Sequence, residues 1–270
     1  MSKIIYAPKS WNPISGCSPV SEGCANCWAK VMARRQRQEW GTVHLRPQRV
    51  LEQPLHWHKP QTVAVAFMGD LFHGKVPDEF IDKVFAVMAL TPQHTYLLLT
   101  KRPERMRAYL NRNAPWLLWA AAAQVLTGHS LDHVLPWPLP NVWLGVSCEN
   151  QARADERIPL LQRTSAAHIW ASLEPLLEPI DLRLRLRERR VTLPGAGTWV
   201  SRPLDWIVVG GESGPHARPC DLGWIRDVVE QCRAATVPCF VKQASGLRPG
   251  TQGGIPDELW QVKQLPEGWL

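Results

Sequence analysis

The sequence predicts an α/β protein built on a parallel sheet, in the form of a partial, TIM-barrel-like (β/α)6-type barrel. Short, continuous apolar runs recur along the 270 residues, and most are followed by a stretch with helical periodicity. Strands covered by helices on both faces have such unbroken runs, whereas half-exposed strands alternate. The predicted strands span residues 61–68, 95–99, 142–146, 168–172, 205–209 and 238–241.

The segments that connect these strands have helical patterns. The predicted helices span residues 26–40, 77–90, 104–111, 151–162 and 222–235. Pro77 suits a first helical turn, and Asp78 and Glu79 suit the positive end of the helix dipole. Residues 114–140 interrupt the repeat with an alanine run and several prolines, which predicts an insertion with one short helix. We expect residues 1–270 to form a single domain, because α/β barrels commonly reach about 250 residues.

Composition places the chain among soluble globular proteins, with 45% hydrophobic and 20% charged residues. No stretch approaches the roughly 20 apolar residues that a membrane span needs. The first ten residues lack the apolar core of a signal peptide. We therefore expect a cytoplasmic protein without membrane contact. In that compartment the seven cysteines argue against a disulfide framework, and the close-set ones predict metal or redox chemistry. The four scattered cysteines, Cys148, Cys220, Cys232 and Cys239, are expected to be small buried hydrophobic residues.

The net charge of +7 and the pI near 9.2 favour anionic partners, nucleic acid first. An arginine-rich stretch at residues 183–190 and the fourteen tryptophans point the same way, since aromatic rings among cations can stack bases. The same tryptophans could instead fill the core. A basic protein with no nucleic-acid partner fits the composition equally well.

Nearly every predicted strand is followed by a polar or glycine-containing cluster. The clusters lie at residues 69–73, 100–102, 147–150, 172–174, 210–213 and 242–243. The carboxyl ends of parallel barrel strands share one face, and active sites form there. We therefore predict that the six clusters converge on one pocket. Turns alone would not require so many ionisable groups, which favours an active site at this face.

Three cysteines precede the first predicted helix: Cys17, then six residues, Cys24, then two residues, Cys27. The close pair brings two sulfurs to one ion or cluster, and Cys17 reaches the same centre across a loop. Structural zinc usually takes four protein ligands, and no second close cysteine pair is present. His56 and His58 could complete a zinc site, so zinc remains an alternative. Three thiolates on an iron–sulfur cluster would leave one iron open for another ligand.

Several motifs carry a resemblance to a known family. They read WNP at residues 11–13, GC at 16–17, GCANCWA at 23–29, GDLFH at 69–73, LTKRP at 99–103, GVSCE at 145–149 and GGESG at 210–214. From about Trp11 to Gln243 the chain resembles an uncharacterised phage and prophage family with a three-cysteine motif. That family is similar to the radical S-adenosylmethionine (radical SAM) superfamily. The usual superfamily spacing is three residues and then two, so the longer first spacing is a departure.

The resemblance implies a radical SAM-like fold and an enzyme. Cys17, Cys24 and Cys27 would bind a [4Fe-4S] cluster, whose open iron would take the amino and carboxylate groups of S-adenosyl-L-methionine. One electron would then yield a 5′-deoxyadenosyl radical that abstracts hydrogen from the substrate. An electron donor such as flavodoxin or ferredoxin would be required. The expected substrate is a nucleic-acid base or a nucleotide, and whether a partner protein delivers it stays open.

The resemblance also suggests cofactor-binding roles for individual residues. Asp70 would hold the methionyl amino group, and Ser147 and Glu149 would contact the ribose or the carboxylate. Gly210 and Gly211 would let the backbone approach the adenosine closely, since glycine has no Cβ.

The resemblance further implies that Lys101, Glu174 and Glu212 are catalytic residues, which would face the substrate or the cofactor carboxylate. Two other functions compete with this hypothesis. One is a zinc- or cluster-stabilised nucleic-acid-binding protein without catalysis. The other is a metal-dependent hydrolase that uses Asp70, Glu174, Glu212 and histidines, but such an enzyme would not need the three cysteines.

Overall fold

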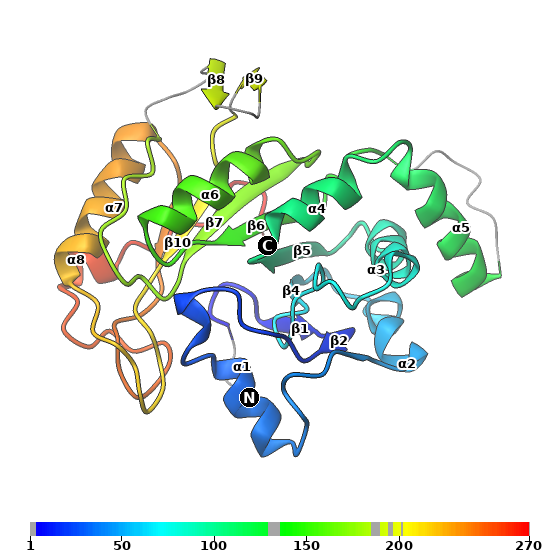
Figure 1. The fold of residues 1–270 in the computed structure, drawn as a ribbon, viewed down its shortest axis with the longest axis horizontal. Coiled ribbons are helices and arrows are strands. Elements are labelled where there is room, and N and C mark those ends of the chain that lie inside the picture. Colours follow the sequence, from blue (N-terminus) through cyan, green and yellow to red (C-terminus); the bar gives the residue numbers. More distant parts are fainter. Residues whose placement is uncertain (1–3, 129–135, 185–189, 194–196, 201, 270) are drawn as a thin grey trace.

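The computed structural model describes residues 4–128, 136–184, 190–193, 197–200 and 202–269. Its centre is a seven-stranded sheet in the order β1-β4-β5-β6-β7-β10-β11, and every neighbouring pair is parallel. The sheet curls into a half-barrel (Figure 1). The strands are β1 (Lys9–Trp11), β4 (Thr62–Val65), β5 (Thr95–Thr100), β6 (Val142–Ser147), β7 (His168–Leu173), β10 (Trp206–Val209) and β11 (Cys239–Val241). The α/β class and the parallel half-barrel are thus confirmed.

Helices follow the strands and cover the outside of the curl (Figure 1). The longer ones are α1 (Trp28–Arg35), α3 (Asp78–Leu90), α4 (Pro103–Leu110), α5 (Pro115–Thr127), α6 (Gln151–Gln162) and α7 (Leu222–Ala235). Helix α6 packs on β6 and β7, and α7 packs on β10 and β11. Helix α1 lies apart from this outer layer, below the sheet in Figure 1. The short helices are η1 (Glu22–Cys24), α2 (Gln48–Leu51), η2 (Gln53–His56) and α8 (Asp257–Trp260).

Two helices differ from the prediction by more than one residue at an end. Helix α1 spans Trp28–Arg35 instead of residues 26–40. Arg37 then takes a positive φ of 54°, and the chain turns so that the Trp40 carbonyl accepts the Cys17 N–H at 3.0 Å. The helix of the insertion is not short: α5 has 13 residues, begins with Pro115 and packs along α3. Residues 129–135 of the insertion lie outside the described part of the chain.

Side chains alternate between two apolar layers along each strand. In β4, Val63 and Val65 point into the outer layer beneath the helices, whereas Ala64 points into the barrel interior. The interior layer is mainly aromatic. Its buried members are Tyr6, Ala7, Ala64, Leu97, Trp143, Trp170, Trp206, Val208 and Phe240. Because these two layers cover both faces of the sheet, each strand appears in the sequence as a continuous apolar run.

Gly145 in β6 makes room for the aromatic interior. A Cβ at this position would lie 2.5 Å from the indole of Trp170, which is fully buried. The Trp170 Nε1–H donates to the Leu98 carbonyl at 3.2 Å, so the only polar atom of this buried ring has a hydrogen-bond partner. These interior tryptophans fill the core and are not available to stack bases.

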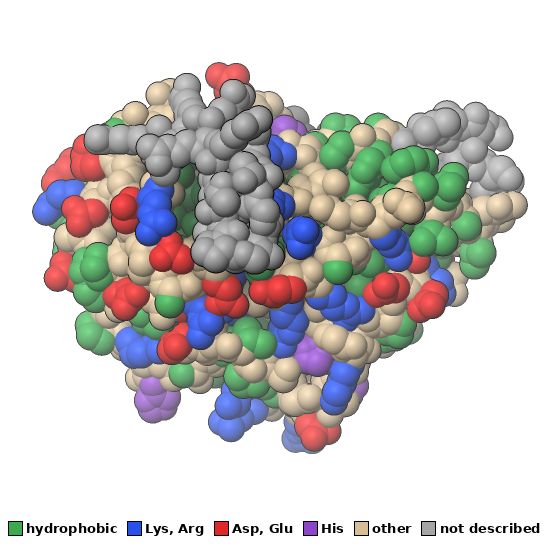
Figure 2. All heavy atoms as spheres, turned by 45° about the horizontal axis from the view of Figure 1, so that its top comes forward, with side chains coloured by type: hydrophobic (Ala, Val, Ile, Leu, Met, Phe, Trp, Pro, Cys, Tyr) green, Lys and Arg blue, Asp and Glu red, His purple; other side chains and the backbone are tan. Residues whose placement is uncertain are grey.

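Two small antiparallel pairs accompany the main sheet: β2 (Ile14–Ser15) with β3 (His44–Leu45), and β8 (Arg190–Leu193) with β9 (Gly197–Val200). Residues 185–189 of the arginine-rich stretch lie outside the described residues. On the face drawn in Figure 2, acidic and basic side chains are intermingled rather than separated by sign. In the described part of the chain, no helix is long and apolar enough to cross a bilayer.

Candidate functional site

One cavity of about 200 Å³ lies where the cysteine loop meets the carboxyl ends of the strands. Each of the six predicted strand-end clusters contributes at least one residue to its lining, so the predicted convergence is confirmed. Of the residues proposed from the sequence, it is lined by Cys17, Cys24, Cys27, Asp70, Lys101, Ser147, Glu174, Gly211 and Glu212. Glu149 and Gly210 lie outside this lining.

The cysteine loop is shaped by local backbone features. Gly16 has a φ of +86°, and a Cβ there would lie 1.9 Å from the Thr42 carbonyl oxygen, so only glycine fits. Cys17 follows directly, Cys24 ends the single turn of η1, and Cys27 is the N-cap residue of α1. The loop therefore presents three sulfurs to the cavity from three different local conformations.

The three cysteines are free thiols. Burial raises the pKa of the Cys17 thiol, and the nearby Arg102 guanidinium opposes that rise. Among the described residues, no group of three or more His, Cys, Asp or Glu side chains is arranged around a single-ion position. His56 and His58, which could have completed a zinc site, do not line the cavity.

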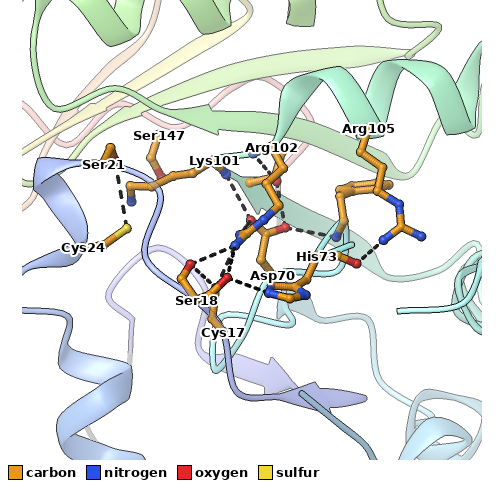
Figure 3. A network of polar contacts seen from close by, with 12 residues as sticks. Cys17, Ser18, Ser21, Cys24, Asp70, His73, Lys101, Arg102, Arg105 and Ser147 are labelled. Carbon is orange, nitrogen blue, oxygen red and sulfur yellow. Dashed lines mark hydrogen bonds and ion pairs between the residues drawn. The ribbon is translucent and has the colours of Figure 1, made fainter. Parts of the chain in front are cut away.

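Arg102 connects the cysteine loop to the half-barrel (Figure 3). Its Nη1 lies 3.4 Å from the Cys17 sulfur and 2.8 Å from Asp70 Oδ2. Its Nη2 donates to the carbonyl of Ser18 at 2.8 Å and to the Ser18 hydroxyl at 3.1 Å. One guanidinium therefore fixes the loop at two consecutive residues.

His73 forms a second contact with Ser18, in addition to the contacts from Arg102. Its Nδ1 accepts the Lys75 N–H at 3.1 Å, so Nε2 carries the proton of the neutral ring and donates to the Ser18 hydroxyl at 2.8 Å. Burial lowers the pKa of His73, and the Arg102 charge lowers it further, which keeps the ring neutral. His73 supports the loop and does not line the cavity.

Asp70 is only 4% exposed and its two oxygens already accept four hydrogen bonds. The donors are the backbone N–H groups of Phe72 and Lys101, the Thr100 hydroxyl and Arg102. A carboxylate has about four acceptor sites. Asp70 therefore positions Arg102, and little capacity remains for a cofactor amino group.

Glu149 supports the loop from behind. It is completely buried, lies 3.1 Å from Arg157 Nη1 and accepts the Gly23 N–H at 3.2 Å. A Cβ on Gly23 would lie 2.9 Å from the Glu149 carboxyl carbon. The glycine beside Cys24 therefore allows direct contact between the loop and a buried ion pair.

Glu212 holds the end of the loop. Its carboxylate pairs with Arg218 at 2.6 Å and accepts the Asn26 side-chain N–H at 3.0 Å. Burial alone would raise the pKa of Glu212, but the hydrogen bonds from Arg218 and Asn26 outweigh it and leave the pKa lowered. We call Asp70, Glu149 and Glu212 the anchoring carboxylates, because each of them holds the cysteine loop directly or through an arginine.

The opposite side of the cavity has spare polar capacity, and we call Lys101, Ser147, Glu174 and Lys242 the open wall. Within the described structure, the Lys101 ammonium and the Ser147 hydroxyl form no hydrogen bond or ion pair. Lys242 Nζ lies 2.9 Å from Glu174 Oε1, but the direction is wrong for a hydrogen bond, so that buried oxygen lacks a proper donor. In Figure 3 the Lys101 side chain extends toward the part of the loop that carries Cys24.

Comparison with known proteins gives one match. A family model described as "Protein of unknown function (DUF5131)" matches residues 1–258. The chain belongs to the DUF5131 family. No curated protein and no solved structure matches the chain. The function of this DUF5131 protein is therefore inferred from its own geometry.

The two predicted adenosine-contacting glycines of this DUF5131 protein have packing roles. A Cβ on Gly211 would lie 2.3 Å from the Ser245 backbone nitrogen. A Cβ on Gly210 would lie 3.1 Å from both the Gln243 carbonyl oxygen and Glu174 Oε1. Close contact between neighbouring strand-end loops explains both glycines, and only Gly211 reaches the cavity.

Sequence reasoning missed four residues that shape this DUF5131 site: Ser18, Asn26, Arg157 and Arg218. Asn26 and Ser18 lie inside the cysteine motif, so their position was a usable signal. Arg157 is eight residues from Glu149, and the eight-residue spacing gives no indication of a pair. Arg218 follows Glu212 by six residues across a turn, which is equally uninformative.

Proposed function

We propose that this protein is a radical SAM enzyme whose [4Fe-4S] cluster is held by Cys17, Cys24 and Cys27. The observation that carries the proposal is that three free thiols from one loop line the same cavity as polar groups from six strand ends of a parallel half-barrel. Three cysteine ligands leave one iron of a cubane cluster without a protein ligand. The open wall lies across the same cavity, where a small molecule on that iron would be bound.

The number of donors favours a cluster over a structural zinc. Structural zinc usually takes four protein ligands. The cavity is lined by three cysteines, and His56 and His58, which could have completed a zinc site, are not in its lining. A cubane cluster can be held by three protein thiolates. Burial raises the pKa of the Cys17 thiol, and the Arg102 N–H at 3.4 Å from its sulfur partly offsets that rise and so assists the thiolate that ligation needs.

When bound, the cluster would supply the one electron that cleaves S-adenosylmethionine into methionine and a 5′-deoxyadenosyl radical, which abstracts hydrogen from the substrate. That electron comes from a donor such as flavodoxin or ferredoxin. The chain's own residues bind and orient the reactants. The Lys101 ammonium has no partner and can pair with a carboxylate, and the underused Glu174 oxygen can accept from an amino group or a hydroxyl. Because Asp70 is saturated, we assign the amino group to Glu174.

The test is anaerobic purification followed by iron and sulfide analysis. We expect a brown protein with broad absorption at about 400 nm, typical of thiolate-ligated iron–sulfur centres. Dithionite with S-adenosylmethionine should then release 5′-deoxyadenosine. Replacement of Cys17, Cys24 or Cys27 by serine should abolish both signals.

Cys220→Ser is the matched control, because Cys220 is also a partly exposed thiol but does not line the cavity. It should leave iron content and product release unchanged. A colourless protein that carries one zinc would refute the proposal. A cluster without 5′-deoxyadenosine release would indicate a cluster-stabilised binding protein.

A further inference from the structure

A second hollow, which we call the α1 groove, runs beside the cysteine cavity and has a volume of about 920 Å³. It lies between α1, the chain start near Ile5, and the loops around Pro215 and Leu247. Seven residues line both the groove and the cavity: Asn26, Cys27, Trp28, Phe67, Ser213, Lys242 and Gln243. A molecule in the groove would therefore lie directly against the proposed reaction site.

The groove carries one sign of charge. Its lining includes Lys30, Arg34, Arg35, Lys242 and Arg248, and among the described residues that line it there is no Asp or Glu. Of these cations only Lys242 takes part in an ion pair in the described structure. This differs from the intermingled charges on the face in Figure 2. Unpaired cations around one groove attract a polyanion.

The groove also presents an exposed aromatic ring at the mouth of the cavity. Trp28 is 43% exposed, whereas every other tryptophan whose exposure is described is buried or only partly exposed. It is the first residue of α1 and lies next to Cys27. Exposed apolar side chains at Ile5, Val31 and Leu247 continue the surface away from the cavity.

We infer that the α1 groove binds single-stranded nucleic acid, with phosphates on Lys30, Arg34, Arg35 and Arg248 and a base stacked on Trp28. A neighbouring nucleotide would then enter the cysteine cavity. This inference names the substrate class of the proposed enzyme and so rests on the proposed function. Proteins that bind single strands usually combine a positively charged groove for the backbone with aromatic side chains on which the bases stack.

Two features favour a single strand over the other polyanions. The bases of a duplex are stacked on one another and cannot lie on Trp28 or enter a cavity of about 200 Å³. An acidic peptide would match the cations, but its carboxylate side chains gain nothing from an exposed indole beside the cavity. A single strand uses both the charge and the ring.

The first experiment measures the charge contribution by fluorescence anisotropy with fluorescein-labelled oligothymidylate and oligouridylate at several salt concentrations. The double variant Arg34→Gln/Arg35→Gln should bind more weakly. Its slope of log affinity against log salt should be smaller by about 1.4, because each phosphate contact to a single strand contributes about 0.7. Arg226→Gln/Arg233→Gln removes two exposed arginines from α7, outside the groove, and should leave the slope unchanged.

The second experiment measures stacking. Trp28→Ala should weaken binding about 5- to 150-fold, the usual effect of losing one base–aromatic stack. Trp28→Phe keeps an aromatic surface and should recover most of the affinity. Because Trp28 is exposed, circular dichroism of both variants should match that of the unchanged protein.

Three results would overturn the inference: no oligonucleotide binding at low salt, unchanged affinity of Trp28→Ala, or polyglutamate competing as well as oligothymidylate. The last would indicate an acidic protein partner. Neither measurement requires the cluster or S-adenosylmethionine. Binding without 5′-deoxyadenosine release would refute only the proposed chemistry, and release without binding would refute only the substrate class.

Discussion

The two sides of the cysteine cavity use their polar groups in opposite ways. On the side that holds the loop, each anchoring carboxylate has an arginine partner: Asp70 with Arg102, Glu149 with Arg157, and Glu212 with Arg218. On the open wall, the Lys101 ammonium and the Ser147 hydroxyl form no hydrogen bond or ion pair in the described structure, and Glu174 pairs with Lys242 at 2.9 Å but keeps one oxygen without a hydrogen bond. The difference separates two tasks. Saturated groups position the cysteines, and groups with spare capacity remain for a ligand.

The buried pair of Glu149 and Arg157 provides the most severe test of the anchoring side. Arg157→Leu leaves a fully buried carboxylate without a cation, so the free energy of unfolding should fall by about 3–5 kcal/mol. Urea denaturation measures this. Arg233→Leu, which breaks the exposed pair with Glu230, should cost no more than about 1 kcal/mol. Equal losses in the two variants would contradict the comparison.

The open wall should respond in function rather than stability. Lys101→Gln should weaken S-adenosylmethionine binding about 10- to 150-fold, since a hydrogen bond to a charged group contributes about 1.5–3 kcal/mol. Its free energy of unfolding should change by less than about 0.5 kcal/mol. Anaerobic calorimetry and urea denaturation measure the two effects. Lys59→Gln, at an exposed lysine outside the cavity, should alter neither.

Arg102 tests whether the anchoring side controls the metal centre. Arg102→Lys keeps the charge but loses the planar fork that reaches Asp70, Cys17 and Ser18 together. Loss of such a supporting contact typically costs about 10- to 100-fold in metal affinity. Iron retention during chelator challenge measures it. Arg112 pairs with Asp82 away from the cavity, so Arg112→Lys is the matched control. Similar iron loss in that variant would contradict a specific role of Arg102 at the metal centre.

Glu212 should give the smallest effect, and one that depends on pH. Its lowered pKa means that the carboxylate contributes stability above its ordinary value of 4.5, and that this contribution is lost as the pH falls through the lower folded-state pKa. The gap in unfolding free energy between the unchanged protein and Glu212→Gln should therefore be largest near neutrality and shrink in acid. Urea denaturation over a pH series measures it. A gap that grows in acid would show that Glu212 is protonated in the fold.

Much of the fold could be predicted from the sequence because both faces of the sheet are covered. Continuous apolar runs identified β4 to β7, β10 and β11, and α6 and α7 have the predicted bounds. Strand β1 was not predicted. It has three residues, Lys9, Ser10 and Trp11, of which only Trp11 is buried, so neither an apolar run nor an alternation is present.

The sequence could predict which residues line the candidate site, but not which of them have all their hydrogen bonds made within the protein. Strand-end clusters converge in any parallel barrel, so Lys101 and Glu174 could be placed at the cavity from order alone. Whether a carboxylate is saturated depends on tertiary partners. Asp70 and Glu174 look alike in the sequence, but Asp70 accepts four hydrogen bonds whereas Glu174 keeps an unsatisfied oxygen. No local pattern distinguishes them.

The aromatic interior limits how this protein can evolve. Trp143, Trp170 and Trp206 occupy the barrel beneath the cavity, and Gly145 contacts the Trp170 ring without spare space. Enlarging the floor would require several simultaneous substitutions in a close-packed layer. The strand-end loops carry no such constraint, and barrels generally diversify there. Relatives with different substrates are therefore expected to differ in loop length and sequence while they keep the same depth of pocket.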